Sequence, residues 1–359
     1  MKEIALNSPE IEYCGRIDDR DPLHPQFIFP ATYLKFRFVG SFASLKIKNQ
    51  HLDWNNWHNF VGARVDGVQK CYQLNDDENT TVITLLDSED TDKEHEILFF
   101  KRMDCHEITL EELVLSDNAK LIPYEKKPCL KMEVYGDSVS AGEVSEAVDY
   151  VGKVDPVHDG HFSNSYYSYS WMCARKLGAK LHDIAQGGIA QGGIALLDKT
   201  GWFHHPDYIG MESVYDKVHY NSYINSLTTW DFSKFRPHVV VIAIGQNESH
   251  PKDFIKDEPN GEKTVLWKNT YKKFLRHLME IYPKTHFILT TTILEHDISV
   301  DKAIDEVASD FSSPLVHRFY YSKNGCGTKG HVRISEADAM SDELAFFIST
   351  LHIDVTQEV

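Results

Sequence analysis

Residues 238–245 read HVVVIAIG, and this unbroken apolar run decides the fold class. A strand that is apolar at every position is typical of a parallel sheet covered on both faces. Further apolar strands are expected at 130–136, 180–186 and 286–293. Helical stretches alternate with them or follow them, at 165–178, 267–283 and 335–351. Strand–helix alternation of this kind predicts a three-layer α/β sheet.

The first 125 residues differ, because no segment there shows a helical period. Short apolar or alternating runs are separated by turn-rich segments such as DDRDP and NDDENT, and they occur at 27–40, 42–49, 60–67, 80–87, 95–103 and 108–116. This spacing predicts an all-β sandwich of the jelly-roll kind. We therefore expect a jelly-roll domain over 1–125, a linker within IPYEKKP (122–128) and an α/β domain over 129–359.

The overall charge limits the classes of partner. The formal net charge of −17 argues against nucleic acid and anionic membranes, since both require a basic face. No run of 18 apolar residues occurs, and the N-terminus is too acidic for a secretory signal, so we expect a cytoplasmic protein. The six cysteines form no CxxC pair and are expected to be reduced, mostly buried thiols. The sequence does not decide whether the chain forms a homo-oligomer.

Parallel α/β sheets bind ligands outside the carboxyl ends of their strands, so candidate residues should directly follow strands. Ser138, within VYGDSVSAGE (134–143), follows the strand at 130–136. A serine there is either a nucleophile at the strand tip or a helix cap. The chain has no G-x-S-x-G elbow, which disfavours the α/β-hydrolase fold.

Two other strand ends offer donors that could hold an oxyanion. The motif AQGGI occurs at 185–189 and again at 190–194, and its position favours Gly188, with Gly193 as the alternative. Either glycine could instead serve a tight turn. Asn247, in GQNESH, supplies a side-chain amide that donates without titrating, although asparagine is also common in turns.

A base must come from later in the chain. His331, in GCGTKGHVRIS (325–335), lies in a loop before the last helix and is the preferred base among 19 histidines. The segment HHPD (204–207) has no partner cluster for a metal and is discounted.

The four segments GDSVS, AQGGI, GQNE and GH together resemble the SGNH hydrolase superfamily, whose serine, glycine, asparagine and histidine come from four separate blocks. This resemblance implies a flavodoxin-like domain with Ser138, Gly188, Asn247 and His331 in those roles. The third block usually reads GxND, so Glu248 is a departure. A jelly roll that begins GRID and leads into such a domain resembles carbohydrate esterase family 2, whose members remove O-acetyl groups from xylan, mannan or their oligosaccharides.

The family resemblance also implies a mechanism. Most SGNH enzymes carry an aspartate three residues before the histidine, where this chain has Thr328. Family 2 enzymes commonly use a Ser–His dyad, with a backbone carbonyl accepting from the histidine, so we expect an acceptor within 324–329. Asp338 is an alternative. The expected partner is an acetylated oligosaccharide, and neither a metal nor another cofactor is expected. Such a substrate implies aromatic platforms for its sugar rings, and the candidates are Trp202 and Trp230 in the long insertion after the glycine motif, with core packing as the alternative.

The sequence also allows two alternative functions. The first is another SGNH esterase, acting on acetylated sialic acid, lysophospholipids or acyl thioesters. The second is a carbohydrate-binding protein that has lost catalysis, although retention of all four block residues argues against it.

Overall fold

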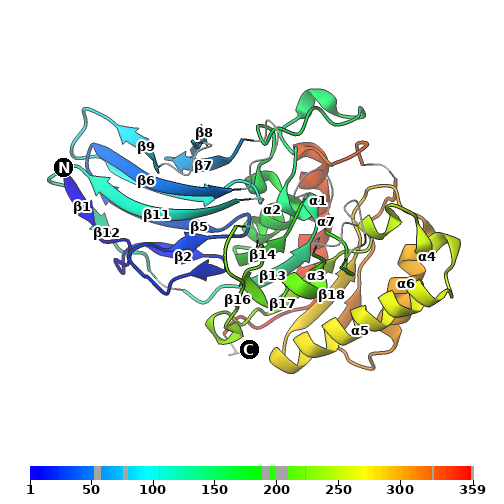
Figure 1. Cartoon of the computed structure of the whole chain (residues 1–359). Helices are drawn as coiled ribbons and strands as arrows, with labels where there is room; N and C mark the ends of the chain where they lie inside the picture. Colours follow the sequence, from blue (N-terminus) through cyan, green and yellow to red (C-terminus); the bar gives the residue numbers. More distant parts are fainter. Residues whose placement is uncertain are drawn as a thin grey trace.

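The structure is a computed structural model. It describes residues 1–51, 58–75, 80–104, 106–125, 127–187, 194–198, 200, 209–222, 224–325 and 327–356. Figure 1 shows two parts side by side: a β-sandwich formed by the N-terminal third of the chain, and an α/β domain formed by the rest. This architecture confirms the predicted fold class.

The sandwich consists of two antiparallel sheets. One has the order β3-β4-β11-β6-β9, with β1 beside β11, and the other has the order β12-β5-β10-β7-β8, with β2 beside β5. The strands are β1 (Lys2–Ile4), β2 (Glu12–Cys14), β3 (Ile17–Asp18), β4 (Gln26–Phe27), β5 (Tyr33–Val39), β6 (Phe42–His51), β7 (Phe60–Val65), β8 (Val68–Gln73), β9 (Thr80–Asp87), β10 (Glu94–Lys101), β11 (His106–Leu115) and β12 (Lys120–Ile122). Strand β5 shows the expected alternation, because Leu34, Phe36 and Phe38 are buried between the sheets while their neighbours are partly exposed.

The α/β domain is built on a parallel sheet with the order β14-β13-β17-β18-β19. Its strands are β13 (Lys131–Gly136), β14 (Lys180–Ala185), β17 (Val239–Ala243), β18 (His286–Thr290) and β19 (Val316–Arg318). Helices α2 (Tyr169–Lys176) and α7 (Ile334–Ser349) cover one face, and α5 (Glu262–Ile281) and α6 (Ile298–Ser309) cover the other. Every residue of β17 is buried, as its apolar sequence predicts.

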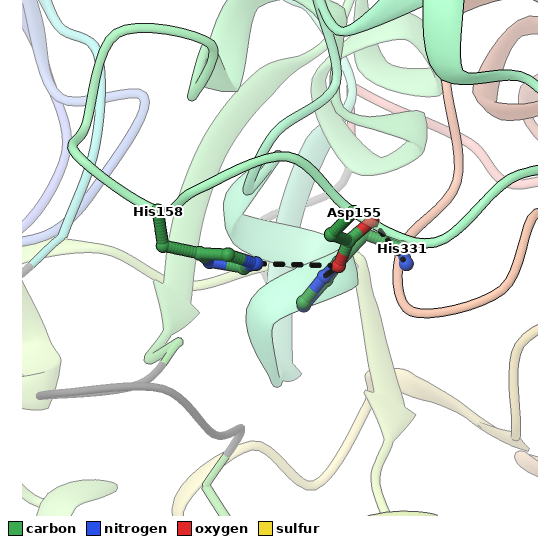
Figure 2. Close-up of side chains that lie close together, drawn as sticks. All are labelled: Asp155, His158 and His331. Carbon is green, nitrogen blue, oxygen red and sulfur yellow. Dashed lines mark hydrogen bonds and ion pairs between the residues drawn. The ribbon is translucent and has the colours of Figure 1, made fainter.

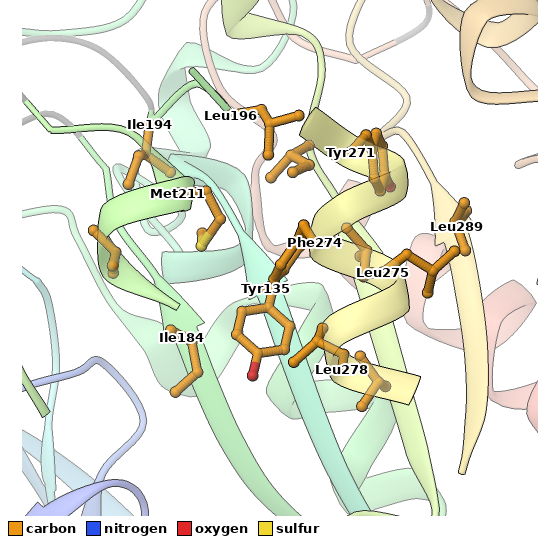
Figure 3. Packing of buried hydrophobic residues seen from close by; sticks show 14 of the residues in the cluster. Tyr135, Ile184, Ile194, Leu196, Met211, Tyr271, Phe274, Leu275, Leu278 and Leu289 are labelled. Atoms are coloured by element: carbon orange, nitrogen blue, oxygen red, sulfur yellow. The ribbon is translucent and has the colours of Figure 1, made fainter. Parts of the chain in front are cut away.

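The face under α5 carries a large apolar core. Figure 3 shows Tyr135 of β13 facing Phe274, Leu275 and Leu278 of α5. The ring of Tyr135 meets that of Phe274 edge to face, at 5.3 Å between centroids. This packing fixes β13, the strand that delivers Ser138, against the longest helix of the domain.

Some elements differ from the sequence prediction. Helix α2 begins only at Tyr169, because residues 165–167 form a 3-10 turn and the Ser168 hydroxyl caps the helix through the Trp171 N–H. Helix α5 begins at Glu262 and ends just before Pro283. Strand β8 and helix α6 were not predicted. The remaining short elements are α1 (Ser138–Ala141), α3 (Met211–Val214), α4 (Phe254–Asp257), β15 (Lys217–His219), β16 (Thr228–Thr229) and the 3-10 turns at 148–150, 232–234 and 247–249.

The sandwich contributes buried contacts to the α/β domain. Arg16, from the GRID segment, is fully buried and donates to the carbonyl oxygens of Tyr215 and Lys217, at 2.6 and 3.0 Å. It also donates to the Tyr135 hydroxyl at 2.8 Å and lies 3.3 Å from the Glu133 carboxylate. A buried guanidinium needs this many partners, so the GRID segment joins the two parts of the chain.

The described cysteines Cys14, Cys71, Cys129 and Cys173 are free thiols. Cys14 and Cys173 are buried as expected, whereas Cys71 is exposed. In the described part of the chain, no helix has the length and apolar character needed to span a bilayer.

Candidate active site

Ser138 is the first residue of α1, and only Asp137 separates it from the end of β13. The helix cap is its neighbour Asp137, whose Oδ1 accepts from the Val139 N–H at 3.0 Å. Because Asp137 performs the capping, the Ser138 hydroxyl is not needed for it. Residue Ser138 is 5% exposed, so it lies in a largely desolvated position at the carboxyl edge of the sheet.

The first glycine after β14 lies against Ser138. A Cβ placed on Gly187 would be 3.2 Å from the Ser138 Cβ and 2.6 Å from Glu143 Oε2, so this position has no room for a side chain. The Gly187 N–H donates to the carboxylate of Asp104, which the sandwich supplies. The predicted oxyanion donor Gly188, its alternative Gly193 and the predicted platform Trp202 lie outside the described residues.

Asn247 reaches the same edge from the end of β17. Its Nδ2 donates to Asp137 Oδ2 at 3.2 Å and, over a longer 3.4 Å, to the Ile194 carbonyl. The amide therefore lies next to the residue that precedes Ser138. The longer contact is the weaker of the two, and its hydrogen could be redirected to a developing oxyanion.

Glu248, the departure from the usual third block, has a structural role. Its Oε1 accepts from the Leu196 N–H at 2.5 Å and from the Trp267 indole N–H at 2.9 Å. Burial raises the pKa of Glu248 to about 7. The carboxyl thus fixes the segment after the glycine motif to helix α5.

His331 is held by a carboxylate that the sequence did not indicate. Its Nδ1 lies 2.6 Å from Oδ2 of Asp155, a residue 176 positions earlier in the chain (Figure 2). The prediction of a backbone acceptor within 324–329 is therefore wrong. The alternative Asp338 is also wrong, because it lies on α7 and pairs with Lys176 at 2.7 Å. Gly330 permits the close approach, since its φ of +91° suits glycine and a Cβ there would collide with the Asp155 carboxylate.

Thr328, at the position of the usual aspartate, anchors the loop that carries Asp155. Its Oγ1 accepts from the Gly152 N–H at 3.1 Å and donates to the Glu336 carboxylate of α7. The Thr328 N–H donates to the same carboxylate at 2.7 Å. The loop is thereby tied to α7, and Asp155 takes the place that the missing aspartate would fill.

Asp155 is ionised in this environment. Its Oδ1 accepts from the guanidinium of Arg333 at 2.6 Å and from the backbone N–H of His331 at 3.3 Å. Burial acts to raise the pKa of Asp155, but hydrogen bonds from His158 and His331 outweigh burial and hold it well below the usual range. An anionic carboxylate at Nδ1 fixes the tautomer in which Nε2 is the acceptor, and it stabilises an imidazolium.

A second histidine joins this group. His158 Nδ1 lies 2.5 Å from Glu143 Oε1, and its Nε2 lies 3.3 Å from Asp155 Oδ2. Burial lowers the pKa of His158, but the hydrogen bonds to Asp155 and Glu143 dominate and raise it to about 10. The other oxygen of Glu143, Oε2, lies 3.6 Å from His331 Nε2. Neither His158 nor Glu143 was predicted from the sequence.

Asp155, His158 and His331 also form a group whose potential ligand atoms all lie within 4.8 Å of one another. Ligand atoms around a tetrahedral zinc ion are about 3.3 Å apart, given bonds of about 2.0 Å. The separation of 2.6 Å between His331 Nδ1 and Asp155 Oδ2 is shorter and fits a shared proton. The spacing thus favours a hydrogen-bonded acid–base group.

Trp230 lies away from this site. It is 8% exposed, and its ring packs on His182, near the beginning of β14, at 5.7 Å between centroids. The guanidinium of Arg16 lies 5.5 Å from the same ring. Trp230 therefore belongs to the buried core toward the opposite edge of the sheet, and the structure does not bring it to Ser138.

Comparison with known proteins places this geometry in a family. The profile of the carbohydrate esterase 2 N-terminal domain matches residues 13–124. An acetylxylan esterase / glucomannan deacetylase of Cellvibrio japonicus is 26% identical over 356 residues, which cover 95% of this chain and 88% of that protein. The chain is thus similar to carbohydrate esterase family 2 along nearly its whole length. The cellulase/esterase CelE of Acetivibrio thermocellus is 25% identical, and the match covers 94% of this chain but only 39% of that longer protein.

Solved structures of carbohydrate esterase family 2 share the fold. The Cellvibrio japonicus enzyme matches with a TM-score of 0.82 at 22% identity, over 99% of both chains. The Clostridium thermocellum enzyme, solved with cellohexaose, matches with a TM-score of 0.77 at 23% identity, over 95% of this chain and 99% of that one. The resemblance predicted from the sequence motifs is confirmed at the level of family and fold.

Proposed function

We propose that this carbohydrate esterase is an O-acetylesterase that removes acetyl groups from xylan or mannan oligosaccharides. The observation that carries the proposal is the pairing of His331 with Asp155 at the sheet edge where β13 delivers Ser138. The similarity to the acetylxylan esterase / glucomannan deacetylase of Cellvibrio japonicus supports the substrate class.

In this proposal Ser138 attacks the acetyl carbonyl while His331 Nε2 accepts its proton. Asp155 stabilises the resulting imidazolium through Nδ1. His331 then protonates the departing sugar oxygen, which leaves an acetyl group on Ser138 Oγ. Water, deprotonated by His331, attacks this ester, and acetate leaves as Ser138 regains its proton. The site uses a triad and not the predicted dyad.

The oxyanion is held by donors from two strand tips. The Ser138 N–H is the first amide of α1, so the helix itself provides no carbonyl for it. The Asn247 amide is the second donor. Gly188, outside the described residues, stays the proposed third donor.

Replacing Asn247 with alanine should lower kcat on the order of 10²–10³-fold, because one preorganised donor to the oxyanion is lost. Steady-state kinetics with p-nitrophenyl acetate measure this, and thermal unfolding checks that the variant is folded. Turnover close to that of the wild type would remove Asn247 from the site.

Acyl-chain preference separates this proposal from the other SGNH esterases. We expect p-nitrophenyl acetate to be hydrolysed with a higher kcat/KM than the octanoate, because the acetyl group is the proposed substrate. A lysophospholipase or thioesterase would prefer the longer chain. A preference for octanoate would overturn the acetylesterase proposal.

We keep four further predictions, on sugar binding, cellular location, oligomeric state and metal dependence. Trp202 stays a proposed sugar platform. A cytoplasmic location, a homo-oligomer and independence from metals are likewise predictions, and unchanged activity after treatment with EDTA would support the last of these.

A further inference from the structure

We propose that Glu143 and His158 are positioning residues that change the basicity of His331 in opposite directions. Glu143 presents an anion to Nε2, and His158 places a cation beside the imidazole. This inference rests on the proposed function, since it assigns His331 as the base.

The geometry makes the four groups one unit. Asp155 Oδ2 is shared between His331 at 2.6 Å and His158 at 3.3 Å (Figure 2). The rings of the two histidines are 5.4 Å apart. His158 Nδ1 lies 2.5 Å from Glu143 Oε1, which leaves Oε2 of the same carboxylate 3.6 Å from His331 Nε2. His158 thereby bridges two carboxylates and fixes where Glu143 presents its second oxygen.

Glu143 lies close to both Ser138 and His331. It follows α1, and its N–H donates to the Ser138 carbonyl at 3.0 Å. A Cβ placed on Gly187 would meet both Glu143 Oε2, at 2.6 Å, and the Ser138 Cβ, at 3.2 Å, so the two side chains border the same small space. The Glu143 side chain is only 3% exposed, so its charge acts on His331 with little screening by water.

The charges around His331 come from several elements. Asp155 and Glu143 are the anions in contact with it, and buried Asp137 lies farther off, before Ser138. The cations are His158 and Arg333, and the latter pairs with Asp155 Oδ1. Burial lowers the pKa of His331, but Glu143 and Asp155 outweigh burial and raise it, while His158 lowers it. Glu143 and His158 thus act in opposite directions on the same base.

The sign of each effect follows from the charge removed. His331 must be neutral to accept a proton, so kcat/KM rises with pH through its pKa, which lies above the ordinary value of about 6.5. His158→Gln removes a cation, and without this cation the imidazolium form of His331 is more stable. The acidic limb of the kcat/KM profile should therefore move upward by about one pH unit. Glu143→Gln removes an anion and should move the limb downward by a similar amount.

The test measures kcat/KM for p-nitrophenyl acetate against pH in the wild type, His158→Gln, Glu143→Gln and the double variant. The pH dependence of inactivation by a serine-directed phosphonate gives a second readout that needs no turnover. We expect opposite shifts in the single variants and an intermediate limb in the double variant. Exposed Asp149, in the turn at 148–150, provides the control Asp149→Asn, which should leave the limb in place.

The inference would be overturned if the folded variants kept the acidic limb of the kcat/KM profile at the wild-type pH. This holds even if kcat falls, because a purely structural role changes the rate without moving a pKa. Shifts of the same sign would also overturn it. If one variant does not fold, the sign of the other decides. Failure of the proposed function is distinguishable, because it would appear in the wild type alone, either as a preference for p-nitrophenyl octanoate or as no reaction with the acetate ester and the phosphonate.

Discussion

Replacing Ser138 with alanine should lower kcat for acetyl esters on the order of 10⁶-fold, as expected for loss of the nucleophile in a serine hydrolase triad. The side chain is small and Asp137 provides the helix cap, so the truncation should leave the fold intact. Kinetics with p-nitrophenyl acetate and the loss of phosphonate labelling measure the effect.

A matched control for this variant is Ser140→Ala, two residues along the same short helix. Ser140 is buried and its hydroxyl bonds to that of Tyr169 at 2.8 Å, so it serves packing and not catalysis. We expect this control to lose some stability and to keep its phosphonate reactivity. Substantial esterase activity in Ser138→Ala would exclude Ser138 as the nucleophile.

Replacing Asp155 with asparagine should lower kcat on the order of 10⁴-fold. The amide Nδ2 would face His331 Nδ1 and favour the tautomer with the proton on Nε2, which cannot accept from Ser138. Asparagine is preferred to alanine because its oxygen can still accept from buried Arg333, whose unpaired charge would destabilise the fold. Steady-state kinetics measure the loss of activity.

Asp149→Asn, in the neighbouring turn, is the control and should retain activity, since this side chain is exposed. Thermal unfolding of both variants separates lost catalysis from lost folding. A folded Asp155→Asn enzyme within tenfold of the wild type would return the account to a Ser–His dyad, as predicted from the sequence.

Residues placed by local patterns were predictable. The apolar runs of β13 and β17 place Ser138 and Asn247 directly after buried strands, and parallel strands bring their carboxyl ends to one edge. The four sequence blocks then identified the family, because each block combines a strand end with a chemically suited residue. Helix α6 carried a readable signal as well, since Val300, Ala303, Ile304 and Val307 recur at helical spacing, but it was not recognised.

Asp155 could not be predicted in the same way. It follows no strand and belongs to no block, and it reaches His331 only because the Gly152 N–H binds Thr328 and Gly330 leaves room for its carboxylate. These contacts join segments about 176 residues apart, which periodicity cannot reveal. Trp230 failed for a related reason, because an irregular insertion gives no period to tell a core residue from a sugar platform.

The most direct test of the central claim is acetate release from acetylated xylan and mannan oligosaccharides by the wild type and by Ser138→Ala. The account predicts that the wild type releases acetate from at least one of the two substrates, and that the variant releases none above the uncatalysed rate. No acetate release by folded wild-type protein from either substrate would contradict the proposed function, and equal release by the variant would contradict the mechanism.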